Sequence, residues 1–68
     1  MKNNILNLKK EIYSLDNINE AVGAYKDICS IDITEIDNEY ILCFVDTKYD
    51  ANKTMNEFEN YLIALENS

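Results

Sequence analysis

The sequence predicts an α+β domain of two layers, in which a three-stranded antiparallel sheet carries two helices on one face. Apolar residues alternate in three segments and recur at helical spacing in two others, in the order β-α-β-β-α. The length of 68 residues allows one small domain, residues 1–68. A right-handed crossover between the first two strands then predicts a strand order of 1-3-2, with both helices on the same side.

The first strand is expected within residues 5–14. Leu6, Leu8 and Ile12 stand there at even spacing, although Lys10 interrupts the row. In the predicted order this strand lies at an edge of the sheet, where nothing covers its outer backbone groups.

A helix of about three turns is expected next. Asn17 and Glu20 have the spacing of a capping box, so we expect Asn17 to cap this helix. The apolar residues that follow at helical spacing form one face, which predicts a buried side. They are Ile18, Ala21, Val22, Tyr25 and Ile28.

Two strands joined by a hairpin follow this helix. Residues 29–34 alternate between apolar and polar side chains, which is typical of a strand with one wet face. Asp37 and Asn38 form a turn signal, and the run Tyr40–Val45 has no polar residue. A strand that is apolar on both faces is typical of the centre of a sheet.

The last element is expected to be a helix that begins after Asp50, a suitable capping residue. The apolar residues that follow recur every three or four positions nearly to the end of the chain, which predicts a second helical core stripe. They are Ala51, Met55, Phe58, Leu62 and Leu65.

The number of residues in the hairpin turn decides which side of the sheet each side chain faces. A two-residue turn places Ile31 and Ile33 with Tyr40, Leu42 and Phe44, and a turn one residue longer inverts this choice. With the shorter turn the open face shows Ile36, Ile41, Cys43 and Val45. Either way the third strand directs apolar side chains to the uncovered face, which is typical of an interface. We therefore expect a candidate interface formed by Leu6, Leu8, Ile12, Ile41, Cys43 and Val45.

Composition limits the possible functions. The chain has no histidine, the usual acid–base group near neutral pH, so we expect no catalytic residues and no enzyme activity. The net charge is −7, and 3 of the 6 lysines lie within residues 1–10, at Lys2, Lys9 and Lys10. An acidic surface without arginine disfavours a nucleic-acid partner. The longest apolar run is far shorter than the roughly 20 residues of a membrane span, so no membrane partner is expected.

Cysteines and carboxylates are the remaining candidates for chemistry. Two cysteines, Cys29 and Cys43, are too few for a secreted disulfide framework, which favours a cytoplasmic location and buried apolar roles for both. Four carboxylates, at Asp32, Glu35, Asp37 and Glu39, surround the hairpin turn, but the DxDxDG pattern of a calcium loop is absent. We therefore expect no metal site and no cofactor.

The tyrosines have separate roles. Tyr25 falls on the apolar stripe of the first helix and is expected in the core, and Tyr61 flanks the stripe of the second helix. Tyr49, in the loop before that helix, is the tyrosine most free to touch a partner.

Several local strings resemble HxsD, the small accessory component of the His-Xaa-Ser systems found beside radical SAM peptide-modifying enzymes. These strings are Ile12–Ile18, Ala24–Asp27 and Cys29–Ile33. The segment Glu57–Ile63 is similar to the closing helix of the family, with Phe58, Asn60 and Leu62 at the positions of its F-x-N-x-L pattern. The likeness spans roughly residues 11–65, although the chain ends in Glu66-Asn67-Ser68 where an arginine is more typical.

The resemblance implies a non-catalytic role beside a peptide-maturation enzyme, as an accessory or docking protein for its substrate. Together with the open edge, it leads us to expect a peptide or partner enzyme bound at the edge or uncovered face of the sheet. The alternative is a small homodimeric structural protein without a peptide ligand, whose copies pair through the same surfaces.

Overall fold

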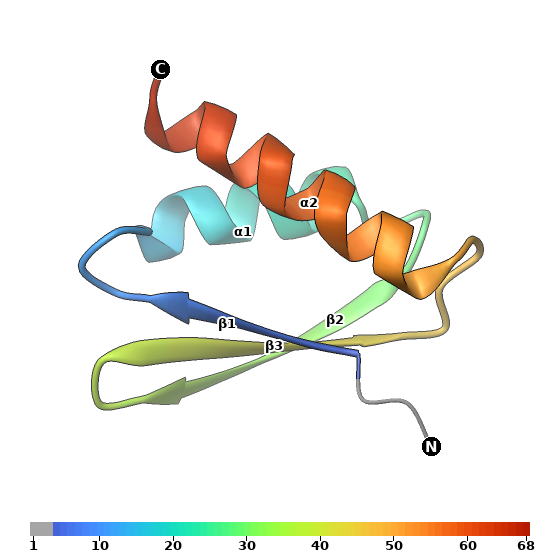
Figure 1. The fold of residues 1–68 in the computed structure, drawn as a ribbon, viewed down its shortest axis with the longest axis horizontal. Coiled ribbons are helices and arrows are strands. Elements are labelled where there is room, and N and C mark those ends of the chain that lie inside the picture. Colours follow the sequence, from blue (N-terminus) through green and yellow to red (C-terminus); the bar gives the residue numbers. More distant parts are fainter. Residues whose placement is uncertain (1–3) are drawn as a thin grey trace.

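A computed structural model describes residues 4–68 and confirms the predicted order of elements. The elements are β1 (Ile5–Lys9), α1 (Leu15–Ala24), β2 (Ser30–Ile36), β3 (Glu39–Val45) and α2 (Ala51–Glu66). The three strands form one antiparallel sheet in the order β1-β3-β2. Figure 1 shows both helices on the same side of this sheet, so that no helix of residues 4–68 covers the other face.

The hairpin between β2 and β3 has the shorter of the two possible turns. Ile36 pairs with Glu39, which leaves only Asp37 and Asn38 in the loop. Leu42 and Phe44 consequently face the helices and are fully buried, together with half-buried Ile31 and Ile33. The register thus resolves the question that the sequence leaves open, and the side chains that alternate with these residues face away from the helices.

β1 is shorter than the expected segment 5–14. It ends at Lys9, whose carbonyl oxygen accepts hydrogen bonds from the backbone N–H groups of Ile12 and Tyr13, at 3.1 and 3.0 Å. These two bonds close a turn, so the prediction that Ile12 belongs to the strand is wrong. The Ile12 side chain lies in this turn and is 58% exposed.

α1 begins three residues earlier than the capping-box spacing suggests. Its cap is Ser14, whose hydroxyl oxygen accepts a hydrogen bond from the Asn17 N–H at 3.2 Å. The prediction of Asn17 as the cap is therefore wrong, because this residue already lies in the first turn. Ile28 follows the end of the helix and lies in the connection to β2.

The core lies between the helices and the sheet. Its buried apolar residues come from β1, α1, β3 and α2 and from the α1–β2 connection: Leu8, Ile18, Ala21, Cys29, Leu42, Phe44, Phe58 and Leu62. β2 contributes only half-buried residues to it. The ring of Phe58 meets those of Phe44 and Tyr25 edge to face, with centroids 5.2 and 5.4 Å apart. α2 begins where expected, with Asp50 accepting a hydrogen bond from the Lys53 N–H at 3.1 Å.

Neither helix of residues 4–68 is long and apolar enough to traverse a bilayer.

Candidate docking surface

The helix-free face of the sheet carries a continuous apolar strip. Along β3 it consists of Val45, Cys43 and Ile41, all of which remain partly exposed. Ile5 of β1 pairs with Cys43 and extends the strip sideways, and Ile36 of β2 lies diagonally beside Ile41 at the other end. We call these five residues the apolar strip.

The strip has polar residues along both sides. Asn7 and Lys9 of β1 stand beside Ile41 and Glu39, while Ser30, Asp32 and Thr34 of β2 stand beside Val45, Cys43 and Ile41. The Asn7 amide nitrogen lies 3.4 Å from a carboxylate oxygen of Glu39. An apolar centre with a polar border has the anatomy of a protein interface, on a small scale.

The outer edge of β1 presents backbone groups that the sheet does not use. The Phe44 N–H donates to the Asn4 carbonyl at 2.8 Å, and the Lys10 N–H donates to the Asn38 carbonyl at 3.0 Å. Because inward and outward residues alternate in an antiparallel pair, Ile5 and Asn7 direct their N–H and C=O groups outward. The Lys9 carbonyl already accepts two hydrogen bonds in the turn that follows β1. Among residues 4–68, the free edge is therefore centred on Ile5 and Asn7.

β2 forms the second edge of the sheet, which the sequence analysis does not single out. The two-residue hairpin makes Ile36 and Glu39 a hydrogen-bonded pair, so Ile31, Ile33 and Glu35 direct their backbone groups outward. Acidic side chains at Asp32 and Glu35 accompany this edge, whereas β1 carries Lys9. The two edges therefore differ in charge.

The residues expected at the interface fall in three different places. Ile41, Cys43 and Val45 lie together on the helix-free face. Leu6 and Leu8 face the helices instead, and Leu8 is only 1% exposed. Their backbone groups point inward to β3, so the groups open to a partner at this edge are those of Ile5 and Asn7. Ile12 lies in the turn beyond the strand.

Sequence reasoning missed Ile5 as a member of the strip. Its position one residue before Leu6 places it on the opposite face of the strand, and this alternation is the signal that could have identified it. The position of Ile5 beside Cys43 follows only from the register of β1 on β3.

The cysteines and the hairpin acids form no reactive cluster in the structure. Cys29 is buried, and burial raises the pKa of its thiol. Cys43 is partly exposed on the strip. Within residues 4–68, no group of three or more cysteine, aspartate or glutamate side chains comes together in a way that could hold a metal ion. Glu35 forms an ion pair with Lys10 at 2.6 Å, and the Lys10 ammonium also lies 5.2 Å from the centre of the Tyr40 ring.

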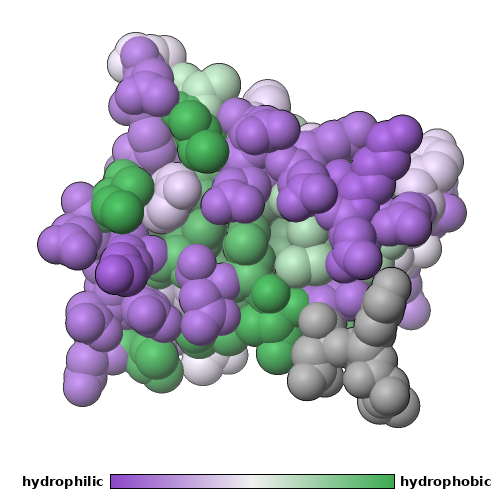
Figure 2. Space-filling view, in the orientation of Figure 1, coloured by the Kyte–Doolittle hydropathy of each residue, from purple (hydrophilic) through white to green (hydrophobic). Residues whose placement is uncertain are grey.

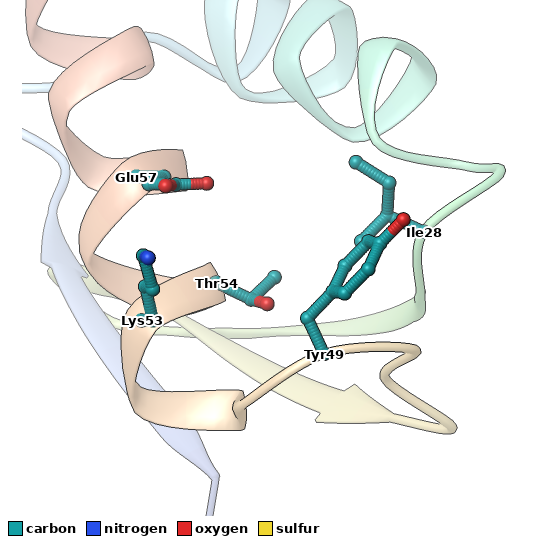
Figure 3. Close-up of a pocket in the computed structure, with 5 residues that line it drawn as sticks. All are labelled: Ile28, Tyr49, Lys53, Thr54 and Glu57. Atoms are coloured by element: carbon teal, nitrogen blue, oxygen red, sulfur yellow. The ribbon is translucent and has the colours of Figure 1, made fainter.

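A separate cavity of about 240 Å³ opens between the loops at the start of α2. Ile28 and Tyr49 line one side, and Lys53, Thr54 and Glu57 of α2 line the other (Figure 3). A backbone hydrogen bond of 2.9 Å, from the Lys48 N–H to the Ile28 carbonyl, holds the two loops together. The sequence does not predict this cavity, although it does predict a free Tyr49, whose side chain is 66% exposed.

Comparison with known proteins identifies no relative. No family model, no curated protein and no solved structure matches the chain.

Proposed function

We propose that this chain is a non-catalytic docking protein, which binds an extended segment of a peptide or partner enzyme along the outer edge of β1. The observation that carries the proposal is the free edge at Ile5 and Asn7, which lies next to the apolar strip. An added strand would gain backbone hydrogen bonds at this edge, and its side chains on the helix-free face would continue the strip.

The surface of β1 supports this choice of edge. Figure 2, drawn in the orientation of Figure 1, shows hydrophobic surface over the sheet below the hydrophilic outer side of α2. Leu6 and Met55 are both partly exposed apolar residues packed against the core. An incoming strand would therefore find apolar surface on both of its faces, with the strip on one side and these residues on the other.

The net charge of −7 indicates the chemistry of the partner. An acidic protein attracts a basic segment, and this attraction weakens as salt is added. The resemblance to HxsD supports a peptide-maturation system as the setting, with a histidine-containing precursor or its radical SAM enzyme as partner. Histidine side chains become cationic below a pH of about 6.5, which would strengthen their binding to this surface.

Titration of the isolated protein with a synthetic peptide of His-Xaa-Ser repeats tests the proposal. At low salt and pH 6 we expect saturable NMR shifts of the backbone amides of Ile5 and Asn7, which weaken as salt is raised. The absence of such shifts, even at low salt, would contradict peptide docking.

Substitution of Asn7 separates edge binding from contact with the face. Asn7→Pro removes one outward N–H without removing a bond of the sheet, and proline is tolerated on edge strands. Proline has no amide signal, so the readout in this variant is the Ile5 amide. We expect Asn7→Pro to abolish the shift of the Ile5 amide, whereas the matched variant Asn7→Thr retains it. Ile41→Asp places a charge in the apolar strip and should weaken binding while leaving the edge intact.

Pairing of two copies is the alternative function, and the apolar strip supports it as well. Two copies could join through β1 or through the strip, in a two-fold interface. A charge of −7 on each copy opposes this association, which is why we prefer a basic partner. Sedimentation at micromolar concentration distinguishes the two functions. A monomer favours peptide docking, and a dimer that Ile41→Asp dissociates favours self-association.

A further inference from the structure

We infer that the cavity between Tyr49 and α2 is a binding site for a phenol ring, presented either as the side chain of a tyrosine or as a free small molecule. This site lies apart from the apolar strip and from the β1 edge, and the inference does not depend on the proposed function. It follows from the size of the cavity and from the polar groups that line it.

The volume of the cavity limits the ligand to one substituted ring. A protein cavity of about 150 Å³ accommodates benzene, so about 240 Å³ holds a ring with a small substituent. Sites for larger ligands such as drug-sized molecules begin at roughly 300 Å³. The exposed ring of Tyr49 and the side chain of Ile28 provide apolar surfaces on which such a ring can pack.

The hydroxyl of Thr54 indicates that the ring carries a hydrogen-bonding group. Thr54 is the buried polar residue of the described chain and is only 3% exposed. Figure 3 shows its side chain directed from α2 toward Tyr49, into the cavity. Within residues 4–68 its hydroxyl forms no hydrogen bond, and its oxygen is not sealed from solvent, so this group is reached from the cavity. A ligand that fills the cavity shields the hydroxyl from water, so a ligand that can bond to it is favoured over one that cannot.

The rim of the cavity carries one charge of each sign. Lys53 and Glu57 are one helical turn apart on α2, and both line the opening (Figure 3). A phenol can donate a hydrogen bond to the carboxylate of Glu57 or accept one from the ammonium of Lys53. A neutral ring with a hydroxyl therefore fits both the apolar wall and the polar groups, whereas toluene leaves the hydroxyl of Thr54 without a partner.

Titration with p-cresol and with toluene tests this site. We expect p-cresol to cause saturable shifts in the amides of Ile28, Tyr49 and Thr54, with weaker binding of toluene. Thr54→Val removes the hydroxyl and keeps the shape of the side chain. It should weaken p-cresol binding by about three- to tenfold, the value of one hydrogen bond, and leave toluene binding unchanged. Thr34→Val on the helix-free face is the matched control and should change neither.

A second ligand distinguishes the source of the ring. Binding of N-acetyltyrosinamide at the same residues assigns the site to tyrosine side chains, and binding of p-cresol alone assigns it to free phenols. Thermal melts confirm that both valine variants are folded. Equal p-cresol affinity in wild type and Thr54→Val, or the absence of saturable shifts at these residues, would overturn the inference.

Discussion

The carboxylate of Glu66 accepts a hydrogen bond from the backbone N–H of Ser14 at 2.7 Å, which ties the end of α2 to the start of α1. The Ser14 hydroxyl lies 3.3 Å from the same carboxylate oxygen. A negative charge at a helix N-terminus also interacts favourably with the unpaired N–H groups and the helix dipole. This contact joins residues 52 positions apart in the sequence and links the two helices of the layer.

The contact predicts a loss of stability in acid. The hydrogen bond from the Ser14 backbone is the largest of the effects that lower the pKa of Glu66. A lowered pKa in the folded state stabilises the protein fully above the ordinary value for glutamate, and this contribution is lost as pH falls through the folded pKa. We expect Glu66→Gln to reduce the free energy of unfolding at pH 7 and to flatten its decline below about pH 4.5. Urea denaturation at several pH values measures the free energy of unfolding of Glu66→Gln. Glu20→Gln, which removes another glutamate charge, is the control. A pH profile identical to that of wild type would contradict it.

Gly23→Ala should stabilise the protein. Gly23 lies within α1, and a Cβ atom added there meets no atom within 4 Å. Alanine in a helix interior is favoured over glycine by about 0.5–1 kcal/mol. Thermal unfolding followed by circular dichroism should show a higher midpoint. The reverse change at an exposed position of α2, Ala64→Gly, should lower the midpoint instead.

The backbone conformation of Asp46 limits which residues this position tolerates. Its φ is 53°, in the left-handed region that few residues other than glycine, asparagine and aspartate adopt. We expect Asp46→Val to lower the free energy of unfolding by about 1–2 kcal/mol, whereas Asp46→Gly stays close to wild type. Urea midpoints compare the two. Equal losses in both variants would show that the carboxylate, and not the backbone, is what the position requires.

The ring of Phe58 contacts two other aromatic rings, those of Phe44 and Tyr25. Phe58→Ala should cost about 3–5 kcal/mol, which is similar to the whole stability expected for a domain of this size, so the variant should be unfolded at 25 °C. Phe58→Leu keeps most of the apolar volume and should remain folded with a loss of about 1–2 kcal/mol. Circular dichroism checks both. Tyr49→Ala, at an exposed aromatic ring, serves as the control and should leave the free energy of unfolding almost unchanged.

The two thiols should react at different rates. Cys43 is partly exposed on the apolar strip, whereas burial of Cys29 also raises the pKa of its thiol and lowers its thiolate fraction. A colorimetric thiol reagent at pH 8 should modify one cysteine quickly and the second only after unfolding. Mass spectrometry of peptides identifies the first site, which we expect to be Cys43. Rapid modification of Cys29 in the folded protein would contradict the packing described here.

Hydrophobic spacing predicts most of the fold. The run Tyr40–Val45 identifies the central strand, because a strand without polar residues on either face is typical of the centre of a sheet. The stripe that includes Phe58 and Leu62 predicts α2 nearly to its last residue. The ends of elements are less predictable, because they depend on competition between local hydrogen bonds. At the start of α1 the Ser14 hydroxyl takes the capping position, and at the end of β1 the Lys9 carbonyl is captured by a turn.

The candidate sites are predictable only in part. Ile41, Cys43 and Val45 follow from the alternation of β3, once the hairpin turn is known to contain two residues. The position of Leu8 on an edge strand predicts it at the interface, but its side chain faces the helices and is buried. The cavity beside Tyr49 arises where two loops and a helix meet, and a local pattern in the sequence carries no information about such a meeting.

A partner bound to the helix-free side of the sheet, as proposed, would also affect how long this chain survives. A partner bound only to the folded form adds about 2.7 kcal/mol to the free energy of unfolding when its free concentration is a hundred times Kd. For so small a protein that increment is a large share of the total. Copies made in excess of their partner would therefore unfold more often and reach proteases sooner, so that degradation would keep the amounts of the two molecules matched in the cell.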